Sequence, residues 1–125
     1  MLQHVSIGVR NIATTKAFYD AAFAPLGYAC LRARDDWLWY GKERVEFSTR
    51  QTDAPVAAHP SSGLHFCFSA PTRSSVDAFH AAAIANGGTD NGRPGIREHY
   101  APNYYAAFVV DPDGYRLEAY CGADA

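Results

Sequence analysis

The sequence has few cysteines and no long apolar segment, and both shortages restrict the kind of protein it encodes. Its three cysteines, Cys30, Cys67 and Cys121, are widely spaced and form no CxxC pair, so neither a disulfide framework nor a structural zinc knuckle is expected. The opening residues MLQHVSIGVR have no basic stretch, and a serine and a glycine interrupt their apolar run. This composition disfavours a signal peptide or a membrane span. We therefore expect a cytoplasmic protein with reduced thiols and no membrane partner.

An excess of one charge sign is also missing. The chain carries 11 Lys and Arg against 13 Asp and Glu, a formal net charge of −2, and the two signs are interspersed. Such a distribution gives no electrostatic footprint for nucleic acid, so we expect no nucleic-acid partner. With 125 residues the chain is long enough to bury a core without disulfides. We predict a single domain spanning residues 1–125.

What the sequence does contain is an internal repeat. A shift of 61 positions, from His4 to His65, also aligns Ala17-Phe18 with Ala78-Phe79 and Gly27 with Gly88. In both halves an alternating stretch, HVSIGV or LHFCFS, leads through a short polar segment into a helical pattern that ends at glycine. Repetition of the element types together with the letters predicts two similar modules.

Each module is expected to contain a strand, a helix and three further strands. Thr14 or Thr15 is the expected start of the first helix and Thr72 that of the second. The segment NGGTDNGRPG, residues 86–95, is predicted to be an irregular loop, with a short strand near IREHY after it. The expected modules are residues 1–50 and 63–125, with a polar, Pro-containing linker at 51–62. The other expected strands cover residues 28–33, 36–40, 44–50, 104–110 and 115–121.

The stretch DPDGYRLEAY, residues 111–120, predicts a tight turn followed by a strand. Asp, Pro, Asp and Gly are the residues that a type I turn prefers at its four positions. In the strand that follows, Leu117 and Ala119 face one side, while Arg116, Glu118 and Tyr120 face the other. Taken alone, Glu118 would be a solvent-exposed residue on an edge strand, because glutamate is seldom buried without a partner.

The phase of four strands gives Glu118 a different interpretation. His4, His65, Glu46 and Glu118 each lie on the strand face opposite the bulky apolar residues. If the apolar faces pack on the helices, the other faces line a cavity in which two imidazoles and two carboxylates converge. These donors suit Zn²⁺, Ni²⁺, Fe²⁺, Mn²⁺ or Co²⁺. Taken singly, a strand histidine is more often an ordinary hydrogen-bonded side chain than a ligand, but the matched positions in two repeats favour one divalent-metal site.

Three segments resemble the vicinal oxygen chelate superfamily, which contains glyoxalase I, bleomycin-resistance proteins and extradiol dioxygenases. They are QHVSIGVRNIATTKAFYDAAFAPLGY, GLHFCFSAP and VVDPDGYRLEAY. The resemblance implies an α+β fold of two βαβββ modules that form a cupped mixed sheet around a central cavity, with the helices on the outer face. It implies His4, His65 and Glu118 as metal ligands. Glu46 matches the fourth ligand position of glyoxalase I-like members.

The resemblance leaves three functions open. The first is a divalent-metal-dependent lyase or isomerase similar to lactoylglutathione lyase, in which the metal chelates vicinal substrate oxygens and Glu118 or Glu46 is the catalytic base. An Fe(II) extradiol-type dioxygenase would use the same ligand types. A non-catalytic protein that binds small molecules or antibiotics, as bleomycin-resistance proteins do, is the third.

Aromatic and sulfur side chains near the expected cavity are candidates for contact with a small-molecule substrate. Aromatic residues could stack a planar ligand, although core packing is the alternative explanation. The resemblance also implies a homodimer, and in some branches of the superfamily the cavity is shared between chains. The candidate substrate-binding residues are Trp39, Cys67, His99, Tyr104 and Tyr105.

Overall fold

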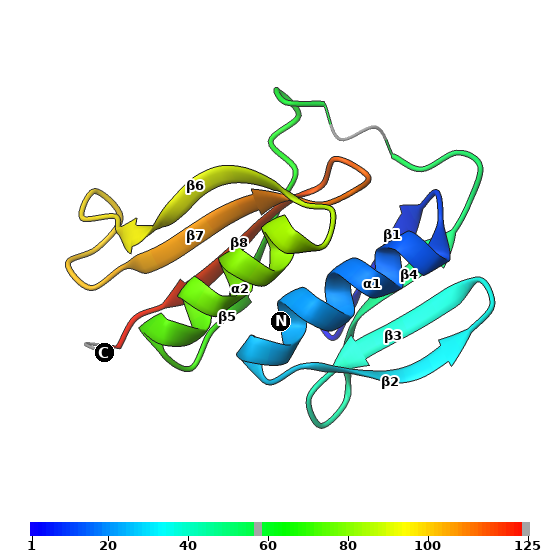
Figure 1. Cartoon of the computed structure of the whole chain (residues 1–125), viewed down its shortest axis with the longest axis horizontal. Coiled ribbons are helices and arrows are strands. Elements are labelled where there is room, and N and C mark those ends of the chain that lie inside the picture. The colour runs from blue at the N-terminus through cyan, green and yellow to red at the C-terminus, as the bar shows by residue number, and fades with distance from the viewer. Residues whose placement is uncertain (57–58, 124–125) are drawn as a thin grey trace.

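A computed structural model describes residues 1–56 and 59–123, and it contains the predicted strand, helix and three strands twice (Figure 1). The first module consists of β1 (Val5–Val9), α1 (Ile12–Phe23), the 3₁₀ turn η1 (Ala24–Leu26), β2 (Ala29–Arg34), β3 (Trp37–Gly41) and β4 (Val45–Gln51). The second consists of β5 (His65–Ser69), α2 (Arg73–Ala85), β6 (Thr89–Ile96), β7 (Tyr105–Val110) and β8 (Arg116–Cys121). The predicted α+β class is confirmed. Residues 57 and 58 of the predicted linker lie outside the described residues.

Each module forms its own four-stranded mixed sheet. The strand orders are β1-β4-β3-β2 and β5-β8-β7-β6. In each sheet the first and last strands of the module pair in parallel, β1 with β4 and β5 with β8, and the other pairs are antiparallel. One helix packs on each sheet, and α1 and α2 lie side by side (Figure 1). The opposite face of each sheet, called the open face below, carries no helix.

The apolar strand faces of both modules share one core with the two helices. Ile7, Val9, Leu117 and Ala119 are buried there, as the predicted alternation requires. Phe23 of α1 joins the modules, because its ring centroid lies 5.7 Å from that of Phe47 and 4.9 Å from that of Phe68. The two modules are therefore packed together by their helix-covered faces.

Hydrogen bonds across the module boundary reinforce this packing. The buried Tyr19 hydroxyl on α1 donates to Asp111 Oδ2 at 2.6 Å, and the Tyr115 hydroxyl donates to the Gly8 carbonyl at 2.7 Å. Burial raises the pKa of Asp111 to about 6, although the bond from Tyr19 acts in the opposite direction. Asp111 also opens the predicted turn, which is confirmed by the Gly114 N–H donating to the Asp111 carbonyl at 3.0 Å.

The prediction that residues 86–95 form an irregular loop is wrong, because most of them belong to β6. This strand lies at the edge of its sheet and pairs only with β7, with register irregularities around Gly92 and Gly95. Gly92 has a φ of 150°, and an edge position tolerates Pro94 because its missing N–H is not needed for pairing on the free side. Glycine and proline thus mark bulges in a strand here instead of ending it.

The helix starts are predicted correctly in one module only. Thr72 caps α2, with its side chain accepting from the Ser75 N–H and the Ser75 side chain accepting from the Thr72 N–H. In α1 the cap is Asn11, whose side chain accepts from the Thr14 N–H, so the predicted start at Thr14 or Thr15 is wrong. Asn and Thr are both good caps, and the sequence offers both within one turn.

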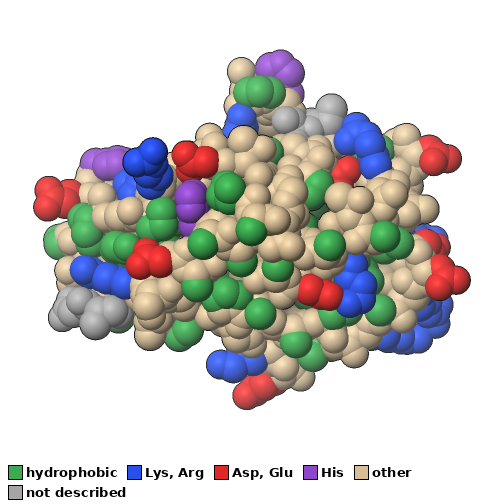
Figure 2. All heavy atoms as spheres, viewed as in Figure 1, with side chains coloured by type: hydrophobic (Ala, Val, Ile, Leu, Met, Phe, Trp, Pro, Cys, Tyr) green, Lys and Arg blue, Asp and Glu red, His purple; other side chains and the backbone are tan. Residues whose placement is uncertain are grey.

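The surface over α1 and α2 carries no extended patch of one charge sign in the view of Figure 2, where acidic and basic side chains are interspersed around the rim. Between them the surface consists of scattered hydrophobic side chains among backbone and other uncharged side chains (Figure 2). No helix among the described residues is long and apolar enough to span a membrane.

Candidate metal and ligand site

His65 and Glu118 come together on the open face of the second module. They lie on the adjacent parallel strands β5 and β8, and His65 Nε2 is 2.8 Å from Glu118 Oε1. The other carboxylate oxygen, Oε2, accepts a 2.5 Å hydrogen bond from the Tyr104 hydroxyl. Glu118 is only 4% exposed, so both of its oxygens are satisfied by side chains and not by bulk water. The predicted exposed-edge alternative for Glu118 does not hold.

Cys67 and three aromatic rings surround this pair. Phe108 lies 6.0 Å from the His65 ring and Tyr120 lies 4.2 Å from the Tyr104 ring, between centroids. Although much of Cys67 is exposed, the pKa of its thiol is raised to about 12. The larger cause is partial burial of the thiol, and the second is the nearby negative charge of Glu118. The thiol is therefore protonated near neutral pH and is a poor nucleophile. Burial and the bond to Glu118 likewise raise the pKa of Tyr104, which keeps its hydroxyl a hydrogen-bond donor.

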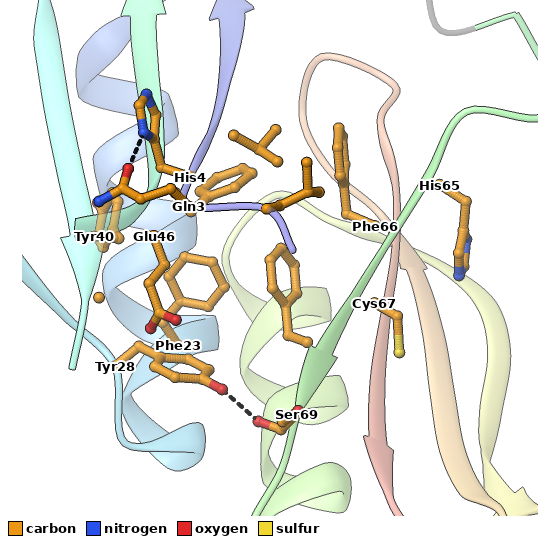
Figure 3. Close-up of a pocket in the computed structure, with 15 residues that line it drawn as sticks. Gln3, His4, Phe23, Tyr28, Tyr40, Glu46, His65, Phe66, Cys67 and Ser69 are labelled. Atoms are coloured by element: carbon orange, nitrogen blue, oxygen red, sulfur yellow. Dashed lines mark hydrogen bonds between the residues drawn. The ribbon is translucent and has the colours of Figure 1, made fainter. Parts of the chain in front are cut away.

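His4 does not join His65 and Glu118 within the chain. It lies just before β1, is exposed, and its Nδ1 is hydrogen-bonded to the Gln3 side chain. A cleft of about 380 Å³ is lined by residues of both modules, and His4 and His65 lie on opposite sides of it (Figure 3). His65 and Cys67 point away from the first module, whereas Phe66 points toward it (Figure 3). Within residues 1–56 and 59–123, no three His, Cys, Asp or Glu side chains gather as a metal cluster.

Glu46 also lies elsewhere, because a bulge interrupts the alternation of β4. Tyr40 pairs with Phe47 and Gly41 pairs with Val45, which leaves Glu46 as the extra residue. Val45 consequently lines the open face, and Glu46 lines the cleft between the modules, with Oε1 3.7 Å from Arg44 Nη2. The predicted placement of Glu46 on the face of Ser48 is therefore wrong.

The open face of the first module holds a second hollow, of about 460 Å³. Trp39 lies there, and its ring stacks on that of Trp37 with centroids 4.8 Å apart. Tyr40 faces the other side and is fully buried in the core. The hollow is lined by Gln3, His4, Ser6, Arg32, Trp37, Trp39, Val45 and Ser48.

The remaining predicted substrate contacts divide between the two faces. The Tyr105 hydroxyl donates to Asp77 on α2 at 2.6 Å, which places Tyr105 on the helix-covered side, away from Glu118. The His99 ring packs 4.3 Å from that of Tyr100, which lies 5.0 Å from that of Tyr104. His99 thus lies at the rim of the site. Sequence reasoning missed Tyr120 as a site residue, although strand alternation already placed it on the face of Glu118.

Comparison with known proteins identifies the family of this chain. Residues 1–119 match the model of the Glyoxalase/Bleomycin resistance protein/Dioxygenase superfamily. The chain belongs to this superfamily. A comparison with curated protein sequences gives no match.

Solved structures show the same fold. A glyoxalase/bleomycin resistance protein from Albidiferax ferrireducens T118 is 32% identical, with a TM-score of 0.82 over 96% of this chain and 97% of that chain. A glyoxalase-related enzyme from Fulvimarina pelagi is 17% identical, with a TM-score of 0.74 over 96% and 86% of the two chains. The fosfomycin resistance protein FosX from Listeria monocytogenes is 15% identical, with a TM-score of 0.72 over 99% and 94%. The last two likenesses concern the fold alone.

Proposed function

We propose that this superfamily member is a divalent-metal-dependent lyase or isomerase of the glyoxalase type, acting on a small substrate with two neighbouring oxygens. The observation that carries the proposal is the His65 and Glu118 pair, with its nitrogen and oxygen 2.8 Å apart on an open sheet face. Imidazole nitrogen and carboxylate oxygen are the donors preferred by Zn²⁺, Ni²⁺, Fe²⁺, Mn²⁺ and Co²⁺.

The residues on this face fit such an ion and would supply some of its ligands. His65 and Glu118 would hold the metal, and the Tyr104 hydroxyl orients the carboxylate through Oε2, so that Oε1 faces His65. A bound divalent ion would stabilise negative charge on the substrate oxygens. Glu118 is the carboxylate nearest this point, so we assign proton transfer to it in preference to Glu46, whose side chain is 47% exposed beside Arg44.

His4 is the third ligand in this proposal, and it would come from a second copy of the chain. The modules pack through their helix-covered faces, so His4 and His65 point away from each other (Figure 3). A homodimer in which the open face of each first module covers that of the partner's second module would bring one imidazole to each His65 and Glu118 pair. The open face of the first module carries the 460 Å³ hollow beside His4, which would leave room for a substrate at such an interface.

Metal content after reconstitution and desalting tests the ligand set. Wild type is expected to retain about one ion per chain, and the variants His4→Asn, His65→Asn and Glu118→Gln are expected to lose it. Glu46→Gln should retain the ion if three ligands suffice. Glu43→Gln is the matched control, because Glu43 is exposed in the turn between β3 and β4 and lines neither the cleft nor the hollow. A wild-type protein that binds none of the five metals would overturn the proposal.

Mixing two inactive variants tests whether the site is shared. In a dimer of one His4→Asn chain and one Glu118→Gln chain, one of the two shared sites has all three ligands intact. After unfolding and refolding together in equal amounts, random pairing should restore about a quarter of the wild-type metal capacity. A site built within one chain would regain none. Size-exclusion chromatography with light scattering checks the dimer itself.

Two alternatives differ in chemistry at the same place. An Fe(II) extradiol dioxygenase would use the same three ligands, and a protein that only binds its ligand would use the stacked Trp37 and Trp39 without turnover. Incubation of the metal-loaded protein with methylglyoxal–thiol adducts, and separately with catechols and O₂, distinguishes them. Turnover of the adducts supports the lyase or isomerase, turnover of catechols supports the dioxygenase, and binding without turnover supports the third function.

A further inference from the structure

The open face of the first module concentrates arginines around the two stacked indoles. Arg32 and Arg34 on β2 and Arg50 on β4 flank β3 on both sides. The guanidinium of Arg32 lies 5.2 Å from the Trp39 ring centroid, and that of Arg50 lies 4.5 Å from the Trp37 centroid. Arg34 lies 6.0 Å from the Trp39 centroid. We call Arg32, Arg34, Trp37, Trp39 and Arg50 the Trp-Arg face.

These three arginines have no carboxylate partner among the ion pairs of the described residues. All three are exposed, yet stacking on the indoles holds them within one small area. Three neighbouring unpaired guanidinium groups on a protein of net charge −2 make a local positive field that favours an anion and repels a cation.

The Trp-Arg face is also hollow and borders His4. The 460 Å³ hollow is lined by Arg32, both indoles and His4, together with Ser6 and Ser48, whose hydroxyls are 2.9 Å apart. The indole Nε1 of Trp37 is buried and has no acceptor among the described residues. The hollow thus combines flat apolar walls with the guanidinium of Arg32 and two hydroxyl groups.

We propose that the Trp-Arg face binds a planar organic anion, such as an aromatic carboxylate, and thereby sets the substrate class of the shared site. Binding of the anion does not depend on the proposed function; its role as the substrate does. The indoles provide stacking surface, and a guanidinium presents a planar fork that matches a carboxylate. Because His4 borders the same hollow, a ligand seated there lies next to the proposed metal. A cationic ligand is disfavoured by the three arginines.

The two tryptophans are the only ones in the chain, so their two indole N–H signals in a ¹H–¹⁵N NMR spectrum report on this face alone. The probes are 2-naphthoate, the neutral 2-naphthylmethanol and the cationic 2-naphthylmethylammonium, each titrated into wild-type protein. We expect saturable shifts of both indole signals with naphthoate. Affinity for the neutral and cationic probes should be at least ~10-fold lower, since a charge-assisted hydrogen bond contributes more than a neutral one.

Charge-neutralising variants on the two strands that flank β3 test the arginines. Arg32→Gln and Arg50→Gln should each weaken naphthoate binding ~10-fold while leaving the neutral probe unchanged. Lys42→Gln is the matched control, because it removes the same charge from the exposed turn between β3 and β4 and should leave naphthoate binding unchanged. Equal binding of the three probes, preference for the cation, or no saturable shift of either indole would each overturn the inference.

Failure of the metal site is distinguishable from failure of this inference. The same titration on metal-free protein and on Glu118→Gln measures anion binding without the metal. If wild type binds no metal, and the anion still binds to it and to Glu118→Gln, the inference about the Trp-Arg face is supported. The lyase or isomerase proposal is then overturned. If the protein binds metal but the anion shifts neither indole signal, the metal site is supported and the inference about the Trp-Arg face is overturned.

Discussion

Asp111 provides the sharpest test of how the two modules are joined, through the variant Asp111→Asn. In the folded protein its carboxyl is 4% exposed, accepts the Tyr19 hydroxyl across the module boundary, and has its pKa raised by burial from 3.8 to about 6. A raised pKa means that the folded state binds the proton more tightly than the unfolded state. The stabilisation is therefore complete below pH 3.8 and is lost as the pH rises through 6.

The size of the effect follows from the shift. Each pH unit of pKa difference corresponds to about 1.4 kcal/mol, so the shift of about two units corresponds to roughly 3 kcal/mol between pH 4 and pH 7. An asparagine can still accept the backbone N–H groups of Asp113 and Tyr115 through its oxygen, and it carries no titrating proton. The free energy of unfolding of wild type minus that of Asp111→Asn should thus fall by up to ~3 kcal/mol over this range.

Urea unfolding of both proteins at half-unit steps from pH 4 to pH 8 measures this difference and cancels most other titrations. Tyr19→Phe is a second informative variant. It removes a hydrogen bond that lowers the pKa of Asp111, so it should destabilise the fold most above pH 6, where the carboxylate is charged. A wild-type minus Asp111→Asn difference that is flat across the range would show that Asp111 is not buried at this boundary, and would refute the packing described for the modules.

Three further outcomes are expected from single substitutions. Phe23→Ala should lower the free energy of unfolding by about 3–5 kcal/mol, because this ring fills the space between the two sheets; a loss below 1 kcal/mol in urea unfolding would contradict that role. Thr72→Ala should cost about 1 kcal/mol through loss of the α2 capping box, measured by thermal unfolding, with Thr72→Ser expected to restore most of it. Tyr104→Phe should weaken metal affinity ~10-fold or more, since Glu118 Oε2 loses its donor; chelator competition with unchanged affinity would show that the hydroxyl does not orient the carboxylate.

Local rules were sufficient wherever one face of a strand was apolar and no bulge intervened. The alternation of β8 places Leu117 and Ala119 in the core and Glu118 on the open face, as the structure has them. The turn at residues 111–114, just before β8, forms because Asp, Pro, Asp and Gly are the residues that a type I turn prefers at its four positions. The internal repeat then predicts the second module from the first, since matching apolar faces must pack on matching helices.

Local rules failed where pairing across the sheet decides the outcome. Glu46 leaves its expected face because Gly41 pairs with Val45 while Tyr40 pairs with Phe47, and a bulge of one residue is invisible in a single strand. A Cβ on Gly41 would lie 1.8 Å from the Arg44 carbonyl oxygen, so glycine is what permits this close turn. β6 was missed for a related reason, because its glycines mark irregular pairing with β7.

Whether His4 meets Glu118 depends on which chain supplies each sheet face, and the alternation of side chains along a strand carries no information about this. Strand alternation predicts that His4, His65 and Glu118 all lie on the faces opposite the helix-covered core. This prediction is the same whether the two open faces meet within one chain or between two chains. The contacts on the covered side favour the second of these cases for the proposed ligands. Turning the open faces of one chain toward each other would break the hydrogen bonds from Tyr19 to Asp111 and from Tyr115 to Gly8 and would separate Phe23 from Phe68. We infer that the module boundary which stabilises the single chain also keeps the proposed metal ligands apart, so that the proposed site would be completed by a second copy.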